Sequence, residues 1–394
     1  MNVKMNIDAL NKALTTLKLV FDSDAIAEDQ KNIIFWNSGS GFKVVARNAI
    51  VDCICGVDAE CEGSENEMVN IKYKELDATL NAFKSLSMTK ATDIAFTFND
   101  KSIDVKISEE PIDTEYEFAD RLYRVNKFTL SLVKSVADSI KREILSVSLE
   151  SDGVAVSGED VLKYFNALIP TIKDIKSEGV ATRYNVVNGY AYTTPQQFIA
   201  IMKNDVADFS DFILTKATAE FVKAFFNNEN TTNVYIQETD NGSKMIRLTN
   251  SSACAIIKAQ GTAKAFIIDA YKTMPKDGVA VDKKYFCDVL RRMKADEAVK
   301  ITITDEEITL SQARVTVTVP VLTSRFPDSV EKVSFSTTVA LLNNLVFAHF
   351  MAGDRLFIYF EEASGNKWDL SFTDDSQAMD GTHLWWTRIS HRKN

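Results

Sequence analysis

The sequence predicts an α+β protein made of three similar domains, each with two helices and antiparallel strands. One module recurs: a short strand-like lead, a helix with apolar residues at three- and four-residue spacing, then alternating strands. The six modules start near Met5, Asn70, Tyr123, Phe212, Val279 and Val333. One module cannot bury both faces of its strands, so we expect the modules to pair into domains at 1–120, 121–265 and 266–394.

The second and fifth modules show this pattern most clearly. The second reads NIKYKELDATLNAFKSL and then DIAFTFNDKSIDVKIS, and the fifth reads VAVDKKYFCDVLRRMK and then AVKITITDEEITLSQARVTVTVPVL. The third, at NKFTLSLVKSVADSIK, and the fourth, at ILTKATAEFVKAFFNN, follow the same order, while the first and sixth are looser. Connections between domains are expected near Pro111 and Pro275, where a finished set of strands precedes a new lead.

Composition predicts a folded protein that stays in the compartment where it is made. Of the residues, 45% are hydrophobic and 25% are charged, and no apolar run approaches the length of a membrane span. Cys53 and Cys55 lie two apart on an expected strand, which suits core packing, and the sequence has no second CxxC or histidine pair for zinc. The cysteines are therefore interpreted as structural, in a reducing cytoplasm.

Positive charge is concentrated on the expected helices. The segments 6–19, 72–90, 127–143, 216–226 and 282–295 hold 17 of the chain's 45 basic residues but only 8 of its 55 acidic residues. The rest of the molecule is strongly acidic, because the whole chain has a formal net charge of -10.

Within three of these helices the charges form a row on one face. The rows are Lys134, Asp138 and Lys141; Lys216, Glu220 and Lys223; and Lys284, Asp288 and Arg291. Opposite faces are apolar, as at Val133, Val136 and Ile140, or at Tyr285, Phe286, Val289, Leu290 and Met293. An ordinary solvated surface would explain any one row. Their recurrence favours a shared task, contact with DNA phosphates, while the acidic exterior repels stray DNA.

We therefore expect the DNA-facing side chains to be basic residues of the first five helices. They are Lys18, Lys84, Lys134, Lys141, Arg142, Lys216, Lys223, Lys284, Arg291 and Arg292.

Three segments resemble the bacterial β sliding clamps. SVADSIKREILSVSLESDGVAVSGEDVLKY is similar to the opening of that family's second domain, AFIIDAYKTMPKDGVAVDKKYFCDVL to the linker before its third, and SRFPDSV to its FPD signature. The resemblance implies the DNA-clamp fold and a head-to-tail homodimer that encircles double-stranded DNA. It also implies a processivity factor, without enzymatic activity, that tethers a DNA polymerase and is placed on DNA by a clamp loader.

The resemblance also implies an apolar pocket for a partner peptide. The positions carried over are Val156, Gly158, Leu162, Tyr164, Met274, Pro275, Leu384, Trp385 and Trp386. Two features depart from the family: Ser157 to Asp160 replace its glycine turn, and HLWWTRISHRKN replaces its ending. Such divergence suits a phage clamp in the cytoplasm of an infected bacterium, or a bacterial one.

Sequence motifs for catalysis are missing. The chain has three histidines and no Walker-type loop, GxSxG or HExxH, so no catalytic residue, metal site or cofactor is predicted. Two alternatives to a clamp stay open. One is a virion or scaffold repeat protein, and the other is a metal-dependent nucleic-acid enzyme using pairs such as Asp374-Asp375 or Glu361-Glu362.

Overall fold

The computed structural model describes most of the chain. The described residues are 1–22, 31–86, 91–109, 127–133, 153–172, 183–187, 189–194, 198–203, 206, 209–227, 231–238, 244–259, 261, 275–347, 353–374 and 385–393. They form two compact units, one of Met1–Gly158 with Glu220–Ala259 and the other of Glu159–Ala219 with Gln260–Asn394. None of the helices described is both long and apolar enough to span a membrane.

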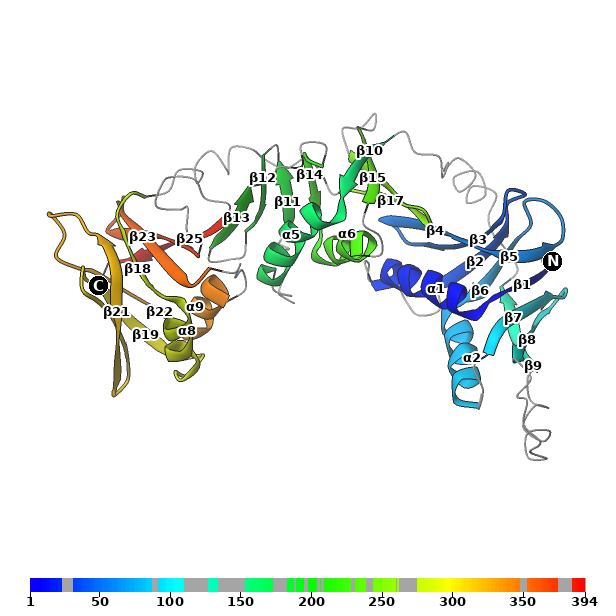
Figure 1. Ribbon diagram of the computed structural model, residues 1–394, viewed down its shortest axis with the longest axis horizontal. Coiled ribbons are helices and arrows are strands. Elements are labelled where there is room, and N and C mark those ends of the chain that lie inside the picture. The colour runs from blue at the N-terminus through cyan, green and yellow to red at the C-terminus, as the bar shows by residue number, and fades with distance from the viewer. Residues whose placement is uncertain are drawn as a thin grey trace. The chain divides into compact units, whose positions relative to one another are not determined.

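The first unit contains one antiparallel sheet of 13 strands with helices packed on it (Figure 1). Its early elements are β1 (Asn2–Asn6), α1 (Ile7–Asp22), β2 (Asn32–Asn37), β3 (Phe42–Arg47), β4 (Val51–Val57), β5 (Ala59–Glu62), β6 (Met68–Lys72), α2 (Tyr73–Leu86), β7 (Ala91–Phe98), β8 (Ser102–Glu109) and β9 (Lys127–Val133). Its later elements are β10 (Val154–Ser157), β15 (Thr231–Glu238), β16 (Lys244–Thr249) and β17 (Ala253–Lys258).

The second unit contains a 12-stranded antiparallel sheet. Its elements begin with α5 (Gly158–Leu168), η3 (Ile169–Thr171), β11 (Tyr184–Val187), β12 (Tyr190–Thr193), β13 (Ile199–Lys203), β14 (Phe212–Leu214) and α6 (Lys216–Asn227), a helix whose later part belongs to the first unit. They continue with β18 (Gly278–Asp282), α8 (Lys283–Arg291), β19 (Ala298–Ile303), β20 (Glu307–Gln312), β21 (Val315–Arg325), β22 (Val333–Thr338), α9 (Val339–Phe347), β23 (Arg355–Ala363), β24 (Lys367–Thr373) and β25 (Trp385–Arg392).

The same strand connectivity occurs three times, as repeats β1–β9, β10–β17 and β18–β25. In each repeat the first strand pairs with the strand after the second helix, as β1 with β7, β10 with β15 and β18 with β23. The second strand pairs with the strand before that helix, as β2 with β6, β11 with β14 and β19 with β22. The predicted α+β fold with six helix-plus-strands modules is therefore confirmed.

The predicted start of the third module is wrong. We expected a helix over 127–143, but residues 127–133 form strand β9, which is antiparallel to β8. Its side chains alternate, with Leu130 buried between exposed Thr129 and Ser131. Residues 134–143 lie outside the described part of the chain. The module starts instead at β10 and continues into α5, a helix that the sequence reading took for a glycine turn.

Each first helix buries one apolar stripe against the sheet. In α1 the buried side chains include Leu10, Leu14 and Leu17, at the spacing that places them on one face. From the sheet, the Cys55 thiol points at this helix and donates to the Ala13 carbonyl oxygen at 3.9 Å. Cys53, Cys55, Cys254 and Cys287 are buried and Cys61 is half-buried, and all five are free thiols. The structural interpretation of Cys53 and Cys55 is confirmed by their burial.

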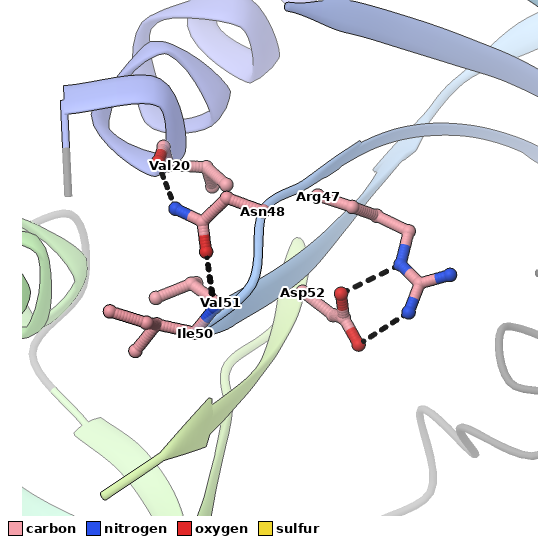
Figure 2. Close-up of polar contacts among 6 residues, drawn as sticks. All are labelled: Val20, Arg47, Asn48, Ile50, Val51 and Asp52. Carbon is pink, nitrogen blue, oxygen red and sulfur yellow. Dashed lines mark hydrogen bonds and ion pairs between the residues drawn. The ribbon is translucent and has the colours of Figure 1, made fainter. Parts of the chain in front are cut away.

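A polar side chain at or just after the end of the third strand holds the end of the first helix in each repeat. In the first repeat the Asn48 amide donates to the Val20 carbonyl oxygen, while its oxygen accepts from the backbone of Ile50 and Val51 at 2.7 and 2.6 Å (Figure 2). The adjacent Arg47 and Asp52 form a two-point ion pair across the same hairpin, at 2.7 and 3.1 Å (Figure 2). These contacts satisfy groups that a helix end leaves without a partner.

The other two repeats achieve the same connection with different residues. In the second, the Thr193 hydroxyl bonds the Thr171 hydroxyl just after α5. In the third, the Gln312 amide accepts from the Lys294 backbone N–H at 2.9 Å and donates to its carbonyl oxygen at 2.9 Å. The first helix of every repeat is thereby fixed to the same hairpin of its sheet.

We expect Gln312→Ala to destabilise the protein by about 1–2 kcal/mol, because it removes the hydrogen bonds at the end of α8. Chemical denaturation of the full chain measures this change. Gln237 is an exposed glutamine on β15, and Gln237→Ala is the matched control, with a change below about 0.5 kcal/mol expected. Equal effects of the two substitutions would contradict the role given to Gln312.

Candidate functional site

Helix α8 presents a charged face to solvent. Its first turn is capped by Asp282, whose carboxylate accepts from the Tyr285 backbone N–H at 2.6 Å. Lys284 and Arg291 are exposed, and Arg291 bonds Asp288 at 2.8 Å. The row expected on this helix therefore lies on its solvent side.

The opposite face of α8 is the buried one. Phe286, Cys287, Val289 and Leu290 are buried there, and burial raises the pKa of the Cys287 thiol to about 11. Tyr285 was expected to belong to this apolar face, which is wrong: its side chain is 47% exposed. The residue is next to Lys284 in sequence and two turns before Arg292, which is exposed at the helix C-cap.

The remaining expected DNA-facing residues are more varied. Lys18 is exposed on α1, and on α6 Lys216 and Lys223 are half-buried around an exposed Glu220. Lys84 lies in α2, and its side chain is not among those described. Three further residues lie outside the described part of the chain: Lys134, Lys141 and Arg142.

Helix α5 begins with acidic residues. Exposed Glu159 and Asp160 lie in its first turn, where carboxylates suit the helix dipole, and Lys163 pairs with them at 4.0 and 3.2 Å. The sequence did contain a signal for this helix: Val161, Phe165 and Leu168 repeat at helical spacing, and all three are buried.

The residues expected to form the partner pocket belong to both units, and the structure describes the side chains of only some of them. Val156 is buried in β10 of the first unit, and Gly158 starts α5. In the second unit Tyr164 and Pro275 are buried and Leu162 is half-buried. Trp385 and Trp386 lie on β25 opposite Met202 and Ile201, but the tryptophan side chains are not described. Met274 and Leu384 lie outside the described residues.

The expected glycine turn also has a different position. Gly158 is helical, whereas Gly189 has a φ of +79° in the two-residue connection between β11 and β12. That left-handed conformation is one that glycine adopts without strain. The left-handed glycine is therefore Gly189, in a hairpin, and not Gly158, at a helix start.

A cavity of about 470 Å³ opens in the second unit between β22, α9 and β25. Its lining residues are Ala298, Ser336, Thr337, Thr338, Leu341, Ile389, Ser390 and His391. In the first repeat the equivalent strands β6 and β9 pair at Asn70–Val133 and Ile71–Leu132. Among the residues described in the third repeat, β22 and β25 are not hydrogen-bonded neighbours, which accounts for the space between them.

Two buried polar atoms of this cavity's lining lack a hydrogen-bond partner among the described residues. They are the Thr337 hydroxyl and His391 Nε2. The His391 ring stacks on Phe335 with 5.2 Å between centroids, and burial lowers the pKa of His391. Exposed Ser336, Thr338 and Ser390 beside the apolar Leu341 and Ile389 give the cavity a lining that suits an amphipathic ligand. The sequence gives no signal for this cavity, because its lining residues lie far apart in the chain.

Other polar clusters in the described part of the chain have structural explanations. No group of three or more His, Cys, Asp or Glu side chains there could hold a metal ion. The buried Asp374 carboxylate bonds Lys283 at 2.8 Å and so ties the start of α8 to the end of β24. Asp374 is therefore engaged in an ion pair, and Glu361 and Glu362 are exposed on β23.

The structure is similar over its whole length to solved structures of bacterial DNA sliding clamps. The DNA polymerase sliding clamp from Caulobacter crescentus matches with a TM-score of 0.75 at 13% identity, over 99% of both chains. The chain has the sliding-clamp fold. The DNA polymerase III subunit beta from Pseudomonas aeruginosa gives 0.72 at 11% identity over 100% of both chains. That from Thermotoga maritima gives 0.70 at 11%, over 99% of this chain and 98% of the other.

The sliding-clamp fold is reached here with little shared sequence. No family model and no curated protein matches the chain. The three repeats, with two helices each against antiparallel strands, are the features that this clamp fold keeps.

We expect the cavity histidine to make stability depend on pH. Because burial lowers its pKa below the ordinary 6.5, the folded state disfavours protonated His391. Its contribution is complete above pH 6.5 and is lost as the pH falls from there towards the lowered pKa. His391→Phe keeps the ring on Phe335 but cannot titrate. In thermal melts, the Tm of wild type should fall more than the Tm of this variant between neutral and mildly acidic pH. Equal falls in Tm would contradict the role given to His391.

Proposed function

We propose that the protein is a sliding clamp, a ring of two chains that encircles double-stranded DNA and tethers a DNA polymerase without being an enzyme itself. The observation that carries the proposal concerns two strand edges. Among the described residues, 127–131 of β9 pair only with β8, and 315–320 of β21 pair only with β20. Clamp loading by a separate loader is part of the same proposal, because a closed ring must be opened to admit DNA.

The strand pairing between repeats follows one rule. The last strand of the second repeat, β17, is antiparallel to β4, the fourth strand of the first repeat. The last strand of the third repeat, β25, is antiparallel to β13, the fourth strand of the second. By this rule, the last strand of a repeat pairs with the fourth strand of the repeat before it. Two strands have no such partner among the described residues: β9, the last strand of the first repeat, and β21, the fourth strand of the third repeat.

The burial of β21 differs from that of its equivalents. β4 and β13 are almost entirely buried. β21 is mostly exposed, with Val315 at 56% and Leu322 at 53%, and its residues 315–320 pair with β20 on one side. A long, exposed, apolar strand edge is a site for pairing with another chain.

A second copy of the chain supplies the missing partner for each edge. If β9 of one copy pairs with β21 of the other, the same heterologous contact forms twice and the assembly closes as a dimer. We also propose that the ring contains six domains, three from each chain. The repeated pairing supports a second domain that starts near Val154, later than residue 121, and a third that starts near Gly278.

We expect a mass of about twice 44.0 kDa for wild type at micromolar concentration. Val315→Lys with Leu322→Lys should shift the mass towards one chain, because two charges would be buried at the seam. Val154→Lys with Tyr235→Lys changes two comparably exposed apolar residues, at 48% and 40%, and should stay dimeric. Light scattering measures all three, and a monomeric wild type or a dimeric seam variant would contradict the proposed interface.

The ring itself is tested with nicked circular DNA. Dimers assembled in the presence of the circle and then cross-linked should remain on it at high salt and leave it once the DNA is cut. A topological link does not depend on salt, whereas an electrostatic contact weakens steeply with it. Release from intact circles at high salt would argue for a surface-binding or scaffold protein.

We propose that the polymerase docks through a short peptide in the cavity beside β22 and β25. The cavity's exposed Ser336, Thr338 and Ser390 and its apolar Leu341 and Ile389 support this position. This position differs from the one expected around Gly158 and Tyr164, where α5 begins at Gly158 and the Tyr164 ring is buried.

Filling the cavity should block the polymerase without breaking the ring. Ser336 is exposed at the cavity, so Ser336→Phe should remove most of the stimulation of primer extension by the polymerase of the same replication system. Ser40→Phe, at an exposed serine in the first unit, is the control and should leave stimulation unchanged. Both variants should keep dimer mass and Tm. Full stimulation by Ser336→Phe would exclude this cavity as the docking site.

A further inference from the structure

Exposed charge is distributed unequally among the helices. On α8, Lys284 and Arg291 are exposed and Arg292 is exposed at the C-cap. The acidic residues are Asp282, exposed at the N-cap, and Asp288, which is half-buried and bound to Arg291. Among the described helical side chains, α8 therefore presents a clear positive excess.

The other helices do not share this excess in the side chains that the structure describes. On α1, the exposed lysines Lys12 and Lys18 are balanced by exposed Asp8 and Asp22. On α2, exposed Lys74 is matched by exposed Asp77. The remaining exposed charges are acidic on balance, with Glu159, Asp160 and Lys163 on α5 and Glu220 on α6. The sequence of α9 contains no charged residue.

An exposed aromatic ring lies within the positive face of α8. Most large aromatic side chains described are buried, but Tyr285 is 47% exposed. Its backbone N–H is fixed by Asp282, so the ring projects from a rigid first turn. Aromatic rings interleaved with basic side chains are the arrangement that holds single-stranded nucleic acid, because bases stack on the ring while cations contact phosphates.

We propose that α8 is the main DNA-holding helix of each chain and that Tyr285 stacks on unpaired bases, so that the clamp prefers DNA carrying a single-stranded segment. The inference rests on the proposed function and names the form of DNA that its ring holds. Lys284 and Arg292 contact phosphates on either side of the ring of Tyr285. Helices α5 and α6, with carboxylates exposed, keep the rest of the grip weak and allow sliding.

The charge part of the proposal is tested with matched double variants of the full chain. Lys284→Gln with Arg292→Gln removes two positive charges from α8, and Lys12→Gln with Lys18→Gln removes two from α1. Binding to a fluorescein-labelled primer–template is followed by anisotropy over a range of salt. The α8 variant should lose about tenfold in affinity and about two from the slope of log affinity against log salt. The α1 variant should stay within about twofold of wild type.

The stacking part is tested at Tyr285 with labelled oligothymidine and a duplex of equal length. Tyr285→Ala should weaken oligothymidine binding by about 5- to 100-fold and duplex binding much less. Tyr285→Phe keeps the ring and should bind as wild type. Tyr285 is exposed, so both variants should keep dimer mass and Tm, which are measured alongside.

The outcomes separate this inference from the clamp proposal. Equal losses in the α8 and α1 double variants would overturn the concentration of the grip on α8. Unchanged oligothymidine binding by Tyr285→Ala would overturn the stacking role. Either result is compatible with retention of wild type on circular DNA, whereas release of wild type from circles is the failure of the proposed ring itself.

Discussion

The architecture depends on one constraint: the backbone edge of each strand must find a hydrogen-bonding partner. Within the chain this is met by pairing the last strand of one repeat with the fourth strand of the repeat before it, as in β17 with β4 and β25 with β13. The two sheets thus continue from one repeat into the next. Among the described residues, the same constraint leaves residues 127–131 of β9 and 315–320 of β21 paired on one side only, and the proposed head-to-tail assembly would cover these two edges.

The connection between each first helix and its sheet is conserved in position but not in chemistry. In each repeat, a side chain of the equivalent hairpin bonds to the end of the first helix. The side chain is the amide of Asn48 in the first repeat, the hydroxyl of Thr193 in the second and the longer amide of Gln312 in the third. Because the buried stripe and this contact hold the helix, its solvent face is free to vary. One helix can therefore begin with carboxylates, as α5 does, and another can carry cations and a tyrosine, as α8 does.

This chain shares its fold with solved sliding clamps at only 11–13% sequence identity, so the fold requires a pattern of residues and not particular residues. Apolar spacing, strand alternation and turns are compatible with many residue choices, provided that volume and pattern are kept. Differences between repeats are then informative. The β6–β9 pairing closes the first repeat, while the third repeat leaves a cavity beside Thr337 and His391 at the equivalent place.

The sequence by itself determined the α+β class, the recurring module and the helices α1, α2, α6 and α8, because apolar periodicity is a local signal. It misplaced the third module, because KFTLSLVKSV contains both alternating and helical spacing, and only pairing with β8 makes residues 127–133 a strand. Residue spacing predicted the charged row on α8. It did not predict the exposure of Tyr285, because the elements packed around α8 decide which of its side chains are buried. The cavity was decided by tertiary structure alone, because its lining comes from residues far apart in the chain. The same holds for residues 127–131 of β9 and 315–320 of β21, which pair on one side only within the described part of the chain.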